Sequence, residues 1–174
     1  VTALLLRLEK FIQSHGTDRQ PDWQGAEARR IMGDLKGALR TEIPNHFAIE
    51  EQDLFPLYAQ EGGTDMVELL LEDHRVILDL ADEIRPLVEK ALSSPDGLSR
   101  TDWETLRAKG NVFVTELCSH AEKEEFGFVP AVDELLTRQH KLNLVYVIGD
   151  DFDRYSLGAL WQDAKFGFRD PRVW

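Results

Sequence analysis

One phrase occurs twice in the chain: HFAIEEQDLFP spans residues 46–56, and HAEKEEFGFVP spans residues 120–130. Both copies read His-x3-Glu-Glu, and both place a proline ten residues after the histidine. The match extends upstream, because TEIPNHFAIEEQDLFP (41–56) aligns without a gap with TELCSHAEKEEFGFVP (115–130). Chance similarity does not reach this level over sixteen residues. We interpret the pair as an internal repeat in which two helical segments carry the same chemical device.

The spacing inside each phrase points to a metal site. Residues four apart lie on one face of a helix, so His46 pairs with Glu50, and His120 pairs with Glu124. If both faces point into the core, two imidazoles and two carboxylates converge there. Such groups are costly to bury unless they are paired or bound to metal, and close carboxylates need a shared cation or proton. Histidine with carboxylate suits iron, manganese or zinc.

A third histidine fits the same level of the fold. His74 lies in LLEDHRVILDL among apolar residues, and counting back from a turn near residue 96 places it opposite His120. Counting back in the same way from His46, about the turn that precedes its helix, gives a position upstream of Val1. Subtracting the 74-residue spacing of the two phrases from His74 also gives a position before Val1. We therefore expect a fourth histidine there. His15 lies at the far end of the first helical segment, and we do not expect it to be a ligand.

Composition bounds the class of protein. The chain has 174 residues, enough for one domain with a core, and its net charge of −12 argues against a nucleic-acid partner. No apolar run approaches the length of a membrane span, so we expect no membrane partner. The single cysteine, Cys118, excludes an internal disulfide and favours a reducing, cytoplasmic location. We expect Cys118 to be an inert thiol in the core.

Apolar residues recur at helical spacing through most of the chain. The pattern predicts four helical segments in an all-α, up-down-up-down antiparallel four-helix bundle over residues 1–148. Residues 149–174 are aromatic and interrupted by glycine, and they predict a short helix and an extended tail that packs on the bundle or on a second copy, forming a homodimer. The segments are residues 3–12, 23–58, 66–92 (capped by Thr64 or Asp65) and 101–142 (capped by Ser99), and we expect Pro44, Pro56, Pro86 and Pro130 to kink or end helices.

The phrases HFAIEEQDLFP, EDHRVIL and HAEKEEFGFVP, in this order, resemble the hemerythrin-like HHE cation-binding family over about residues 1–140. The resemblance implies a non-haem di-iron centre in a four-helix bundle. It implies that His46, His74 and His120 are iron ligands and that Glu50 and Glu124 bridge the two ions.

The chain departs from the oxygen-carrying hemerythrins at one position. These proteins repeat a histidine one turn after the third-helix histidine, and this chain has Leu78 there. The ligand set is therefore more similar to the four-His, two-Glu type of iron-centre repair and iron-sensing members. Glu51 and Glu125, one residue beyond the repeated glutamates, are expected to support the site or face solvent.

The residues and the resemblance together favour a non-haem di-iron protein. It would bind or react with oxygen, nitric oxide or peroxide, or handle iron in a stress response, and catalytic turnover is left open. The alternative is an iron-responsive sensor or interaction domain without turnover. A third hypothesis is a plain bundle in which the His–Glu pairs are only hydrogen-bonded.

Overall fold

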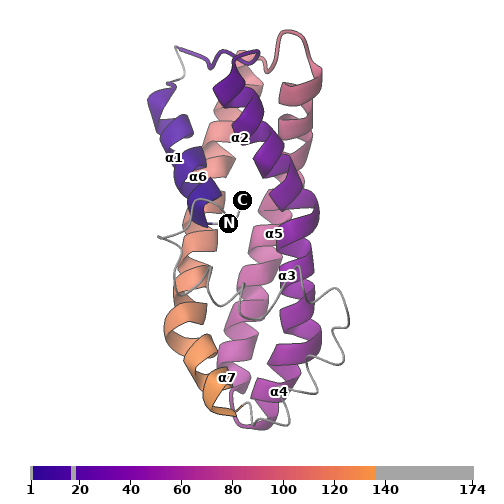
Figure 1. Cartoon of the computed structure of the whole chain (residues 1–174), viewed down its shortest axis with the longest axis vertical. Helices are drawn as coiled ribbons and strands as arrows, with labels where there is room; N and C mark the ends of the chain where they lie inside the picture. Colours follow the sequence, from indigo (N-terminus) through magenta and orange to yellow (C-terminus); the bar gives the residue numbers. More distant parts are fainter. Residues whose placement is uncertain (1, 17–18, 136–174) are drawn as a thin grey trace.

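The computed structural model describes residues 2–16 and 19–135, and these form an all-α bundle (Figure 1). Apart from turns, the described residues lie in α-helices joined in places by short π-helical turns. The α-helices are α1 (Thr2–Ser14), α2 (Ala26–Gly37), α3 (Ile43–Ile49), α4 (Phe55–Gln60), α5 (Thr64–Ser93), α6 (Arg100–Lys123) and α7 (Val129–Leu135). The π-helical turns are η1 (Ala38–Glu42), η2 (Glu50–Leu54) and η3 (Glu124–Phe128).

These elements make four antiparallel rods, which confirms the predicted architecture. The second rod runs without interruption from α2 through α4, and the fourth runs from α6 through α7. The rod of α1 lies beside α2 and α6, and α5 lies beside the same two helices from the other side. Among the described residues, α1 accompanies only the upper half of the molecule in Figure 1, whereas the other three rods continue to its lower end.

The π-helical turns explain three of the prolines. In each turn an N–H bonds to the carbonyl five residues back, which widens the helix locally. A proline follows each bond, and its ring would otherwise meet the carbonyl four residues back. The prolines were expected to kink or end helices, but the rods continue past them. The bonds run from Ile43 to Ala38, from Phe55 to Glu50 and from Val129 to Glu124, and the prolines that follow are Pro44, Pro56 and Pro130.

Two helix starts differ in their caps. The side chain of Ser99 accepts a hydrogen bond from the Asp102 amide at 3.1 Å, which confirms the predicted N-cap of α6. The predicted cap of α5 is wrong, because Thr64 is already its first helical residue and Gly63 precedes it without a side-chain cap.

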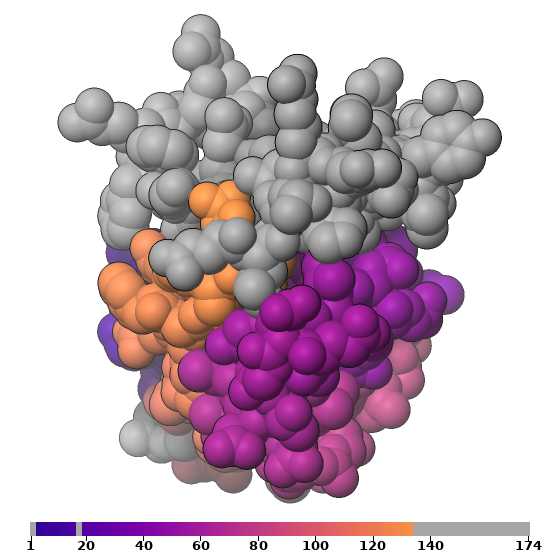
Figure 2. Space-filling view, turned by 90° about the horizontal axis from the view of Figure 1, so that it is seen from below, coloured from indigo at the N-terminus to yellow at the C-terminus, as the bar shows by residue number. Residues whose placement is uncertain are grey.

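The core divides into two clusters that meet at the level of the repeated phrases. The larger one fills the upper part around Trp103 and Phe113, which are fully buried. The smaller one includes Phe55 and Phe128 and closes the lower end, where α4 and α7 lie side by side (Figure 2).

Among the helices of residues 2–135, none is long and apolar enough to cross a membrane. The predicted tail 149–174 and the dimer that it would form lie outside the described residues.

Candidate metal centre

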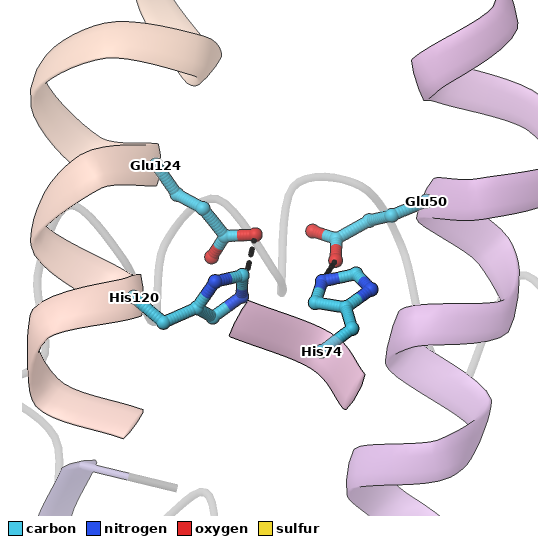
Figure 3. A group of neighbouring side chains, drawn as sticks. All are labelled: Glu50, His74, His120 and Glu124. Atoms are coloured by element: carbon cyan, nitrogen blue, oxygen red, sulfur yellow. Dashed lines mark ion pairs between the residues drawn. The ribbon is translucent and has the colours of Figure 1, made fainter. Parts of the chain in front are cut away.

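Four predicted site residues meet inside the bundle. Glu50 begins the π-helical turn after α3, His74 lies mid-way along α5, His120 lies near the end of α6, and Glu124 begins the π-helical turn after it. One ligand atom from each lies within 4.8 Å of the other three. Figure 3 shows the two carboxylates pointing toward each other from opposite rods, with the two imidazoles beneath them. The structure thus brings together four of the five residues that the sequence analysis names as candidate ligands.

Each imidazole directs one ring nitrogen at a carboxylate of the cluster. His74 Nε2 lies 3.3 Å from Glu50 Oε2, and His120 Nε2 lies 3.1 Å from Glu124 Oε1. The two imidazole rings lie edge to face, with their centroids 4.8 Å apart. The nitrogens and oxygens thus face one central region rather than solvent.

His46 stands at the edge of this group. Its Nε2 lies 3.3 Å from Glu50 Oε1 and 4.0 Å from Glu124 Oε2, so it approaches both carboxylates. Its side chain is 31% exposed, whereas those of His74 and His120 are 1% exposed. His46 therefore occupies the solvent-facing side of the cluster.

The nitrogen and oxygen atoms that face the centre of the cluster have no hydrogen-bond partners. The buried atoms without a hydrogen-bond partner include Glu50 Oε2, His74 Nε2, His120 Nε2 and Glu124 Oε1, so the close pairs lack hydrogen-bond geometry. Nearly all buried polar atoms in proteins have a partner, and a concentration of orphans at one point requires an explanation.

The tautomer of His74 shows why one of these contacts is unfavourable. Its Nδ1 lies 2.8 Å from Glu51 Oε1, and an ionised carboxylate can only accept, so Nδ1 carries the proton. The lone pair of Nε2 then faces Glu50 Oε2, another acceptor, at 3.3 Å. Two acceptors in contact need a cation or a proton between them. The donor set of two imidazoles and two carboxylates fits a metal ion such as iron, manganese or zinc.

Burial and proximity shift the ionisation of these groups. Burial raises the pKa of Glu50 well above its usual range, and the facing carboxylate of Glu124 raises it further. Burial alone would also raise the pKa of Glu124, but contacts with His120 and His46 outweigh it and hold this pKa far below the usual range. Burial lowers the pKa of His74 to about 4 against the opposing effect of Glu51. His74 is therefore neutral at pH 7, the form that binds metal.

A second ring of charged groups supports the histidines from outside. Of the two glutamates expected to support the site or face solvent, Glu51 bonds to His74 Nδ1, and Glu125 is exposed. Asp73 Oδ2 lies 3.5 Å from His120 Nδ1, and Lys123 Nζ donates to both Asp73 oxygens at 2.7 and 2.8 Å. The sequence analysis did not identify Asp73 as a residue of the site, although Asp73 directly precedes His74 in EDHRVIL and could have been identified from that position.

Aromatic rings enclose the cluster. Phe47 stacks on His74 with 3.6 Å between ring centroids and an interplanar angle of 7°, and it meets His120 edge-on at 5.2 Å. Phe55 covers His74 at 5.3 Å from the lower cluster. The π-helical turn η2 places Phe55 there, because its N–H bonds to the Glu50 carbonyl five residues back. These rings fix the imidazole planes and exclude water from the inner side of the site.

Two other predicted residues lie apart from the cluster. His15 bonds through Nδ1 to the Phe11 carbonyl at 2.9 Å near the opposite end of the bundle, as expected for a residue outside the site. Cys118 is exposed, so its assignment to the core is wrong. Its neighbour Leu117 takes the buried position on this part of α6.

Comparison with known proteins agrees with this geometry. The model of the hemerythrin HHE cation binding domain matches residues 2–132, which include the whole cluster. The comparisons with curated proteins and with solved structures gave no significant match. The family match covers most of the chain and both copies of the repeated phrase. The chain therefore belongs to the hemerythrin HHE cation-binding domain family.

Proposed function

We propose that the chain is a non-haem di-iron protein that binds or reacts with oxygen, nitric oxide or peroxide, or handles iron in a stress response. The observation that carries the proposal is the pair of facing acceptors, His74 Nε2 and Glu50 Oε2, 3.3 Å apart in the core. Around it, each copy of the repeated phrase contributes one His–Glu pair: His46 with Glu50 at 3.3 Å, and His120 with Glu124 at 3.1 Å on the opposite rod. Two equivalent pairs support two metal ions more readily than one.

The residues that would hold the ions are those of the two phrases and His74. His74 and His120 would each supply Nε2, the two glutamates would be shared between the ions, and His46 would ligate from the exposed side. Bound iron supplies redox chemistry and an open coordination position for a small ligand.

The chain's own residues shape what can reach the ions. Phe47 and Phe55 cover the imidazoles on the inner side. Of the three predicted histidine ligands, His46 alone has a partly exposed side chain. A small uncharged molecule loses little solvation on entering such apolar surroundings, which favours a ligand of this kind. Leu78, partly buried where oxygen carriers have a further histidine, itself offers no donor atom at that position.

Anaerobic reconstitution with ferrous iron tests the proposal. The protein is expected to bind iron and to develop new visible absorption when oxygen or nitric oxide is added. The Glu50→Ala/Glu124→Ala double variant should lose both properties, and His15→Ala, at the far end of the bundle, should keep them. A wild-type protein that stays colourless and iron-free would contradict the proposal and would favour the purely hydrogen-bonded bundle.

A second candidate function is an iron-responsive sensor or interaction domain. The unsatisfied buried donors favour it, because a metal that satisfies them adds its binding energy to folding. A large rise in thermal stability with iron, together with slower tryptic cleavage within residues 136–174, would support this function. Equal cleavage with and without iron would count against it.

A further inference from the structure

The negative charge of the described chain is gathered at one end of the bundle. Residues 46–75 and 116–135, here called the acidic half, form the lower part of the molecule in Figure 1. They contain 14 Asp and Glu against two Lys and Arg, a formal charge of −12. The other described residues, 2–16, 19–45 and 76–115, contain 12 acidic and 12 basic residues and are formally neutral. The whole excess of negative charge therefore lies in the half that holds the buried cluster.

The two cations of the acidic half are already matched by acids of their own. Arg75 pairs with Glu72, and Lys123 Nζ donates to both oxygens of Asp73. No other lysine or arginine lies in this half. A mobile cation in solution is therefore the natural counter-charge for the remaining carboxylates.

The acidic charge reaches the level of the cluster itself. Each glutamate of the cluster is followed in the chain by an exposed one, Glu51 after Glu50 and Glu125 after Glu124. In the other direction, α5 begins at Thr64, ten residues before His74, which is about 15 Å along the helix axis. At about 0.02 M ionic strength charges act over about 20 Å, so most of the acidic half acts on an ion that approaches the cluster.

The cluster indicates what this field attracts. Glu50 is 5% exposed, and its Oε2 lacks a hydrogen-bond partner, as do the Nε2 atoms of His74 and His120. A buried set of unpaired nitrogens and carboxylate oxygens fits a metal cation. His46, with a side chain that is 31% exposed, lies where the cluster meets solvent. A divalent cation gains twice as much from the surrounding field as a monovalent one, because Coulomb energy is proportional to charge.

We propose that the acidic half is an electrostatic guide, which concentrates divalent cations around the lower end of the bundle and speeds their arrival at the buried cluster. Its exposed carboxylates act at a distance and are not ligands. A surface of one sign of charge raises the local concentration and the association rate of its counter-ion by about 10- to 1,000-fold. Solubility alone does not account for the separation, because it needs net charge but not its confinement to one half. The inference rests on the proposed metal function and adds how the metal reaches its site.

Anaerobic rapid mixing of the 174-residue chain with Fe²⁺ tests the guide. After each delay a chromogenic chelator captures the unbound ion, and the loss of free iron with time gives the association rate constant. This rate constant should fall at least about tenfold when the ionic strength rises from about 0.02 M to about 0.5 M, because salt screens the acidic half.

Neutralising exposed charges in the two halves separates the guide from a general effect of salt. Glu61→Gln/Glu68→Gln/Glu122→Gln removes three exposed carboxylates of the acidic half. It should slow association about two- to threefold at about 0.02 M ionic strength and have no effect at about 0.5 M, with unchanged iron stoichiometry.

The matched control removes three exposed carboxylates from the neutral half. Glu27→Gln/Glu89→Gln/Asp96→Asn changes the net charge of the chain by the same amount. Because these residues lie toward the upper end, association should slow by less than about 1.5-fold at the lower ionic strength.

The possible results distinguish the guide from the proposed function. A wild type that takes up no iron would contradict the proposed function itself. Iron uptake at a rate that does not depend on salt, or equal slowing in the two triple variants, would overturn the guide alone. Loss of bound iron in the triple variant of the acidic half would make one of its three glutamates a ligand and would also overturn the guide.

Discussion

Replacing Glu50 by glutamine should stabilise the metal-free protein and destabilise the metal-loaded one. In the metal-free state the Glu50 side chain is 7% exposed, its Oε2 has no hydrogen-bond partner, and it faces Glu124 in the core. An unsatisfied buried polar atom costs about 1–3 kcal/mol. The amide of glutamine does not ionise, so it avoids the cost of a buried carboxylate beside Glu124, and it offers a donor to the Glu124 carboxylate. The free energy of unfolding of Glu50→Gln is therefore expected to exceed that of the wild type by about 1–3 kcal/mol.

Metal should reverse this order. A ligand present at about 1,000 times its dissociation constant stabilises the folded state by about 4.1 kcal/mol, which exceeds the gain of about 1–3 kcal/mol expected for Glu50→Gln. The wild type gains this stabilisation, whereas the variant loses an anionic ligand and gains much less. The two proteins should therefore exchange rank when ferrous iron replaces chelator.

Urea denaturation followed by circular dichroism, in chelator and in anaerobic ferrous iron, measures both differences. Glu68→Gln is the matched control, because Glu68 is an exposed glutamate on α5, and it should change stability by less than about 0.5 kcal/mol in either buffer. A Glu50→Gln protein that is less stable than the wild type in chelator would refute the reasoning. It would mean that the carboxylate is already satisfied without metal.

Three substitutions away from the site test the account of the fold by the same denaturation assay. Gly97→Ala should lower the free energy of unfolding by at least about 1–2 kcal/mol, because Gly97 has φ +70° and an added Cβ would overlap the indole of Trp23. An unchanged denaturation midpoint would contradict this. Gly33→Ala, on the exposed side of α2 with nothing within 4 Å of the added methyl, should stabilise by about 0.5–1 kcal/mol, and a loss of stability would be inconsistent with the open space there. Ser99→Ala should destabilise by about 1 kcal/mol through loss of the α6 cap, which a neutral result would disprove.

The sequence predicts the four rods and the four central donors because both follow from local periodicity. His46, Glu50, His120 and Glu124 are related by a four-residue spacing that any helix keeps, and His74 follows from counting residues about a turn. The tertiary contacts around them depend on how the rods rotate against one another. The bond from His74 to Glu51 and the approach of Asp73 to His120 require the relative rotation of α3, α5 and α6, which periodicity does not encode.

The π-helical turns could not be predicted from the sequence, for a different reason. The proline at the end of each phrase was predicted to kink or end its helix, because in an α-helix its ring conflicts with the carbonyl four residues back. The chain instead inserts one extra residue into the turn and continues in the same direction. The outcome depends on tertiary packing, since the wider turn buries both Leu54 and Phe55 in the lower cluster. An α-helical turn would place only one of these neighbours directly below Glu50.

Iron stoichiometry tests the central claim most directly. Anaerobic titration of the wild-type chain with ferrous iron, with bound iron counted after removal of excess metal, should give about two ions per chain. The Glu50→Ala/Glu124→Ala variant, with its helix content verified by circular dichroism, should bind none at the same concentrations. Equal iron content in the two proteins would contradict the assignment of the buried His–Glu cluster as the metal centre.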